Sequence, residues 1–253
     1  IRDGCRLVSR FSYVACLGIS EVLRFHGKFN LSATLPFQDC FANLVNSSRL
    51  QTFPIPEGKS GPQTIELLTK RICALGAVQN GSFAVDCETY TSSPGIIGPT
   101  RYVNILHNSE QPASVFAILK SETKTVCLIA DNLFDVLMTK MHTLYSSKKA
   151  TRIESRGPRF EVAEGDFLVK LGTVTMGQNF KGILVDVEYQ PCVIPSNCWE
   201  LLKEFVESFL GSCVGQNPPS YLQNRMNEVY HPRDTMCQYL DQFTAFRKLT
   251  TAR

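Results

Sequence analysis

Acidic and basic side chains recur at every second position in several stretches of the sequence. Asp86 and Glu88 form one such pair and Asp186 and Glu188 form another, while Lys170 lies in a nearby strand-like stretch. Residues two apart in a β-strand project from the same face. Carboxylates and basic groups inside a barrel could bind a divalent metal ion and a triphosphate. One hypothesis is therefore a metal-dependent triphosphate hydrolase of the tunnel-barrel type.

The arrangement of charges also has a simpler interpretation, which we favour. Arg152, Glu154 and Arg156 alternate in the same way, but the Glu-x-Glu-x-Lys strand signature of triphosphate tunnel enzymes does not occur in the sequence. Strands of an antiparallel sheet commonly have one buried face and one solvated face. We therefore expect the alternating charges to lie on solvated faces of half-buried strands.

Other residues with reactive side chains lack the spacing that their chemistry needs. Gly58-Lys59-Ser60 resembles the end of a phosphate-binding loop, but Phe53 stands where that loop requires a glycine. We expect a polar helix start there instead. Cys127 is expected to be a buried strand residue, and no HExxH, GxSxG or CxxC motif is present. The sequence thus predicts no catalytic, cofactor-binding or metal-binding residue, including the four histidines His26, His107, His142 and His231.

Composition and charge narrow the class of protein. The chain has 253 residues, of which 43% are hydrophobic and 19% are charged, in the range of a soluble globular protein. The net charge of +3 is carried by residues 1–50, so the remainder is neutral and gives no case for direct nucleic-acid binding. No apolar run is long enough to span a membrane. The ten scattered cysteines fit a reducing compartment.

The periodicity of apolar residues predicts an α+β protein. Helical spacing is found at 63–75, after a cap at Asp131, at 197–210 and at 235–248. Strand-like runs occupy 82–89, 102–107, 113–120, 125–130, 150–156, 158–163, 166–176 and 181–189, with a tight hairpin at 164–166. Because the helices do not alternate with the strands, we expect an antiparallel β-barrel of about eight or more strands, flanked by α-helices. The aromatic stripe of Trp199, Phe205 and Phe209 is expected in the core.

Several blocks between about residues 54 and 249 resemble the Mediator complex subunit 20 family, also called the TRF-proximal protein family. They include ELLTKRICALGA at 66–77, CLIADNLFDVLMTK at 127–140, DFLVKLGTVTMG at 166–177 and DTMCQYLDQFTAFRK at 234–248. None is a mechanism motif, but their number and order are specific. One departure, at Val162-Ala163-Glu164, lengthens a hairpin.

This resemblance carries expectations about fold, partners and location. It implies a barrel that pairs with Mediator subunit 18, with subunit 8 tethering the pair to the head module. It also implies a nuclear, non-enzymatic coactivator that bridges regulators to RNA polymerase II and to general initiation factors, including the TATA-binding protein. No catalytic residue can be transferred, because the family has none, and no cofactor is expected.

The N-terminal stretch is expected to be separate from the rest. We predict an extension at 1–50 that is outside the family and poorly ordered, and a single domain at 51–253. The first methionine is Met138, so we expect a fragment, a processed product or translated upstream sequence. Residues 1–47 are expected to be dispensable. Arg2, Arg6 and Arg10 before an apolar run leave a cleavable targeting peptide as the alternative.

Overall fold

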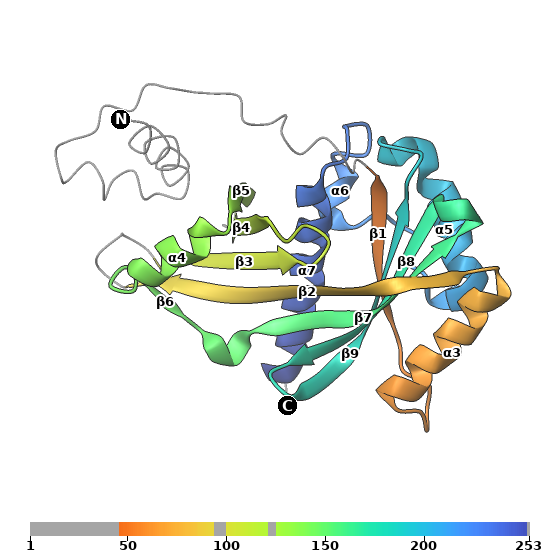
Figure 1. Cartoon of the computed structure of the whole chain (residues 1–253), viewed down its shortest axis with the longest axis horizontal. Helices are drawn as coiled ribbons and strands as arrows, with labels where there is room; N and C mark the ends of the chain where they lie inside the picture. The colour runs from red at the N-terminus through yellow and green to blue at the C-terminus, as the bar shows by residue number, and fades with distance from the viewer. Residues whose placement is uncertain (1–45, 94–99, 121–124, 252–253) are drawn as a thin grey trace. The chain divides into compact units, whose positions relative to one another are not determined.

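The computed structural model describes residues 46–93, 100–120 and 125–251 (Figure 1). Within these residues the strand order is β1-β9-β8-β7-β2-β3-β4-β5, with β6 paired to β2. The chain divides into two compact units. The first unit comprises the described residues of 88–107 and 112–149, and the second unit comprises those of 46–87, 108–111 and 150–251. The strands are β1 (Ser47–Phe53), β2 (Val78–Ser92), β3 (Tyr102–Asn108), β4 (Ser114–Lys120), β5 (Thr125–Asp131), β6 (Tyr145–Ser147), β7 (Ile153–Val162), β8 (Phe167–Met176) and β9 (Asn179–Tyr189).

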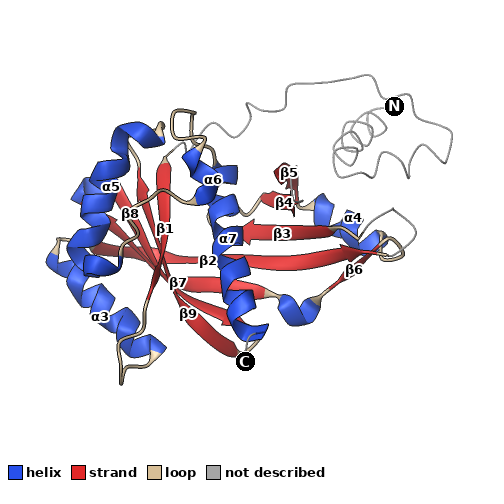
Figure 2. Ribbon diagram, turned by 180° about the vertical axis from the view of Figure 1, so that it is seen from behind, coloured by secondary structure: helices blue, strands red, loops and turns tan. Residues whose placement is uncertain are grey.

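The second unit has three layers, with helices on both faces of an antiparallel sheet. Helices α3 (Gly61–Ala74) and α5 (Pro195–Leu210) cover one face, where Leu68 and Leu202 pack against apolar side chains of β8 and β9. Helix α7 (Pro232–Thr251) lies on the opposite face, as Figure 2 shows, and the short α6 (Ser220–Gln223) precedes it. The central strands are therefore buried on both faces.

The first unit has its own small core. The end of β2, together with β3, β4, β5 and β6, packs with α4 (Leu133–Lys140). The residue at the start of α4 is Asn132, whose side chain makes no capping bond, and not Asp131 as expected. The Asp131 side chain instead accepts a hydrogen bond from the Leu133 N–H at 3.0 Å. The buried residues of this core include Val103, Ile105, Val115, Ala117, Leu128, Phe134, Met138 and Tyr145.

The expected barrel is wrong, because the sheet is open. In the part of the chain that the structure describes, the terminal strands β1 and β5 are not paired with each other. Closing a barrel requires the two end strands to meet in register. Instead, α5 and α7 pack against β1. The α+β class and the antiparallel pairing are confirmed.

Several strands differ from the sequence-based prediction, since β2 is longer than expected at both ends and β6 was not predicted. β1 was not predicted, and it crosses the expected boundary between residues 50 and 51. The two runs at 150–156 and 158–163 form the single strand β7, which continues through Gly157. A Cβ atom at Gly157 would lie 1.9 Å from the Leu171 carbonyl oxygen, so only glycine permits this close approach of β7 and β8.

Candidate functional site

A buried lysine lies among three carboxylates in the second unit. Lys170 on β8 is 2% exposed, and its Nζ lies 2.5 Å from Glu188 Oε1 and 3.6 Å from Asp186 Oδ2 on β9. It also forms an ion pair with Glu110, in the turn between β3 and β4. Lys170 and Asp186 are directly opposite each other in the β8–β9 pairing, which places their side chains on the same face. We call Lys170, Glu110, Asp186 and Glu188 the lysine cluster.

Neighbouring elements supply hydrogen bonds to the lysine cluster. Asp186 accepts from the Ser48 hydroxyl on β1 at 2.6 Å and from the Tyr239 hydroxyl on α7 at 3.0 Å. Glu188 accepts from the Asn46 side chain at 2.5 Å, and Glu110 accepts from Arg159 Nε on β7 at 2.9 Å. Each carboxylate is thus held by the chain's own donors, as buried charges require.

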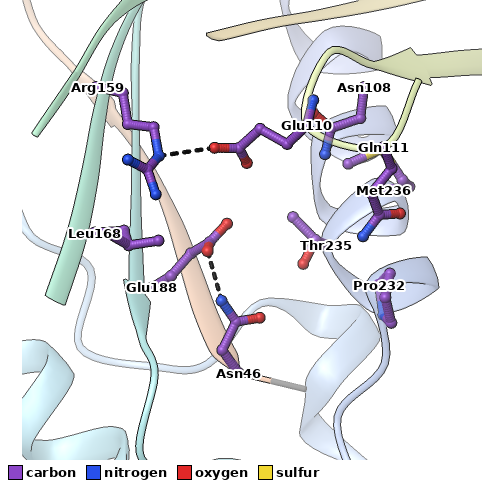
Figure 3. Close-up of a pocket in the computed structure, with 10 residues that line it drawn as sticks. All are labelled: Asn46, Asn108, Glu110, Gln111, Arg159, Leu168, Glu188, Pro232, Thr235 and Met236. Carbon is purple, nitrogen blue, oxygen red and sulfur yellow. Dashed lines mark hydrogen bonds and ion pairs between the residues drawn. The ribbon is translucent and has the colours of Figure 1, made fainter. Parts of the chain in front are cut away.

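A small pocket of about 180 Å³ opens beside the lysine cluster (Figure 3). Glu110 and Glu188 line it from the cluster, Arg159 lies opposite Glu110, and Leu168 adds an apolar wall. The remaining lining residues are Asn46, Asn108, Gln111, Pro232, Thr235 and Met236. The two pocket carboxylates already have basic or amide partners, so the pocket offers no unneutralised acidic pair.

Burial and neighbouring charges shift the pKa values of Lys170 and Asp186 in opposite directions. Burial alone would lower the pKa of Lys170, but the carboxylates of Glu188, Asp186 and Glu110 raise it above its ordinary range. Burial raises the pKa of the Asp186 carboxyl to about 6, against the lowering effect of Lys170. Three carboxylates surround one ammonium group, and Asp186 is the one farthest from it. The Asp186 carboxyl is therefore expected to take up a proton at a higher pH than an ordinary aspartate.

This raised pKa predicts a pH dependence of stability that asparagine at position 186 should abolish. A carboxyl whose folded-state pKa is raised stabilises the fold below its unfolded pKa, and this contribution is lost as the pH rises through about 6. The stability of the wild type relative to Asp186→Asn should fall by on the order of 2–3 kcal/mol between pH 4 and 7. Denaturant titrations of both proteins across this range would measure it. A constant difference would contradict the prediction.

The lysine cluster corrects one sequence-based interpretation. The expected solvated face is wrong for Lys170, Asp186 and Glu188, which are all buried because α7 covers that face of β8 and β9. The alternation itself is confirmed, since Ile183, Val185 and Val187 occupy the opposite face.

The lysine cluster lacks the open acidic ligands that a metal-dependent triphosphate hydrolase would need. Three carboxylates converge on one lysine that is itself enclosed, whereas a triphosphate site needs acidic ligands open to a metal ion. Among the residues that the structure describes, no group of three or more His, Cys, Asp or Glu side chains is placed to hold a metal ion.

The other candidate residues are dispersed. Asp86 forms an ion pair with Arg152 at 3.0 Å, and Glu88 accepts a hydrogen bond from Ser147 in the first unit. Arg156 lies 3.6 Å from Glu154 on the same strand. None of these residues joins the lysine cluster.

Several structural interpretations are confirmed. Ser60 caps α3 in a capping box with Gln63, so the Gly58-Lys59-Ser60 segment is a polar helix start. Phe209 is buried and Phe205 packs against the same core. Trp199 is also buried, in a separate cluster with Leu222 and Tyr230. His142 is exposed, whereas His107 lies 3.1 Å from Asp135. His26 lies outside the described residues. Cys127 is half-buried, not fully buried as expected.

Sequence reasoning missed Arg49, which is 2% exposed. Its guanidinium carbon lies 4.7 Å from the centre of the Trp199 ring, and Nη2 donates to the Gly215 carbonyl. Burial lowers the pKa of Arg49, while Glu207 and Glu200 raise it. Arg49 therefore connects β1 to α5 through a cation–π contact with Trp199. The sequence carried no signal for this contact, because its partners Trp199 and Gly215 are far along the chain from Arg49.

The fold and the lysine cluster define the class of protein. It is an α+β protein built on an open antiparallel sheet, and its buried charged cluster connects strands and helices of the fold. No helix in the described ranges has the length and apolarity needed to cross a membrane. Residues 48–244 match the family model described as the TATA-binding related factor (TRF) of subunit 20 of the Mediator complex. The chain belongs to the Mediator subunit 20 family.

Relatives support this assignment. A Mediator of RNA polymerase II transcription subunit 20 from Aedes aegypti is 59% identical over 80% of this chain and 94% of its own length. The protein of that name from Homo sapiens is 48% identical over 77% of this chain and 91% of its own length. Among solved structures, the inorganic triphosphatase NE1496 has a TM-score of 0.28 and 14% identity, covering 57% of this chain and 75% of that chain. A likeness this weak carries no argument.

Proposed function

We propose that the chain is a non-enzymatic subunit of the Mediator head module, acting in the nucleus as a coactivator of RNA polymerase II transcription. The observation that carries this proposal is the family match over residues 48–244, which extends through both units. The lysine cluster supports the non-enzymatic role, because its charged groups satisfy one another inside the fold.

Within the head module, we propose that the chain binds subunit 18 directly. Subunit 8 would then tether this pair, and the assembled module would contact the polymerase and initiation factors such as the TATA-binding protein. In this arrangement the chain's contribution is a rigid surface. A buried, fully partnered ion network suits that role, since such networks favour one arrangement of the elements that contribute to them.

Co-expression with tagged subunit 18 tests the proposal. We expect the full chain to be retained with the tagged protein and to elute with it as a single species in gel filtration. A Mediator subunit from outside the head module serves as the matched control bait. A thermal melt of the chain alone would first establish that it is folded. A folded chain that elutes unchanged in the presence of subunit 18 would refute direct binding.

A further inference from the structure

Two cysteines lie together at the start of α5, away from the lysine cluster. Cys192 Sγ lies 3.3 Å from the Ile194 carbonyl oxygen, and Cys198 Sγ lies 3.9 Å from the same oxygen. Both sulfurs therefore contact the same carbonyl oxygen. Cys192 is half-buried and Cys198 is buried, so oxidants in solution reach Cys192 more easily.

We propose that Cys192 and Cys198 form a reversible disulfide when the protein meets a peroxide. The Cys192 thiolate attacks hydrogen peroxide, which breaks the O–O bond and leaves a sulfenic acid and hydroxide. The Cys198 sulfur then attacks the Cys192 sulfur, and water leaves as the S–S bond forms. In total, two thiols lose two electrons and two protons, and one peroxide becomes two waters.

The backbone around the pair is held in place. The Cys192 carbonyl accepts hydrogen bonds from both the N–H and the hydroxyl of Ser47, each at 3.0 Å. Two further backbone bonds, from Tyr230 N–H to the Val193 carbonyl and from Ser196 N–H to the Met226 carbonyl, are 2.8 Å long. A disulfide forms readily only where the folded backbone brings two cysteines together, and these bonds hold the segment in which both sulfurs contact the Ile194 carbonyl oxygen.

The environment of each thiol sets the order of the two steps. Burial raises the pKa of Cys198 to about 11, so this residue remains a thiol while the more accessible Cys192 is oxidised. Attack on the sulfenic acid does not require Cys198 to be exposed, because both sulfurs already lie against the Ile194 carbonyl oxygen. Cys198 is thus the resolving residue of the pair.

The disulfide would connect the segment that binds the start of β1 to the first turn of α5. The segment that ends in Cys192 binds Ser47, and Cys198 belongs to the first turns of α5. Linking the two cysteines restricts the unfolded chain and therefore stabilises the folded junction. We expect the melting temperature to be higher for the oxidised protein, with the increase absent in Cys192→Ser.

Peptide mass analysis of the full chain tests the proposal. Residues 182–203 contain both cysteines and no internal Lys or Arg, so trypsin releases them on one peptide. After titration with hydrogen peroxide and alkylation with N-ethylmaleimide, this peptide should lose both labels and be two hydrogens lighter than the dithiol form. Dithiothreitol should restore both labels.

Cys73 provides the internal control, since it is exposed and distant in sequence from the pair. If Cys73 is oxidised while the 182–203 peptide keeps two labels, the proposal is overturned. A Cys192 linked to any other peptide would overturn it equally. In Cys198→Ser, Cys192 should proceed to sulfinic acid. Should that variant not fold, the wild-type masses alone decide the question.

Discussion

Lys170→Met is expected to lower the free energy of unfolding by about 3–5 kcal/mol, because it leaves buried carboxylates without their shared cation. Methionine has a similar length and fills the space that the lysine stem occupies, so the loss reports mainly on charge. Trp199 is the single tryptophan and is buried in the second unit. Its fluorescence during denaturant titration would follow the unfolding of that unit.

Lys70→Met is the matched control for this substitution. Lys70 lies 2.8 Å from Glu66 on α3, but both side chains are mostly exposed, at 73% and 65%. Solvent-exposed ion pairs contribute little, so no measurable change is expected. Adding Glu110→Gln to Lys170→Met should recover part of the lost stability, since one stranded charge is removed. Equal denaturation midpoints for Lys170→Met and Lys70→Met would show that the lysine cluster contributes nothing to stability.

The lysine cluster could be predicted from the sequence only in part. Alternation along β9 correctly separated Asp186 and Glu188 from the apolar face. It could not show that α7 covers the charged face, since Tyr239 is far along the chain from Asp186. One available signal was the nearly continuous apolar run around Lys170, which is typical of a strand buried on both faces.

The remaining errors have a common physical cause. Glu110 comes from a polar turn whose sequence does not specify a distant partner. The open sheet depends on how the end strands meet, which periodicity within each strand does not record. β1 carries the buried polar residues Ser48 and Arg49, so it lacks the apolar alternation that reveals a strand. Tertiary contacts, not local pattern, determine each of these features.

The position of β1 predicts where the stable domain begins. Residues 1–45 lie outside the described residues, and the family match begins at residue 48. We propose that a chain beginning at residue 46 keeps the melting temperature of the full chain. A chain beginning at residue 51, the expected domain boundary, should be much less stable.

The second truncation removes contacts that the rest of the fold cannot replace. It deletes Ser48, a hydrogen-bond donor to Asp186, and Arg49, which packs on Trp199. It also removes Leu50, which is 3% exposed. Losing one buried leucine and leaving polar partners unsatisfied should cost about 3–5 kcal/mol or more, which lowers the melting temperature by roughly 10 °C. Calorimetry of the two truncated chains would measure this difference. If both melt alike, β1 is not needed for the fold; if both melt well below the full chain, residues 1–45 contribute to it.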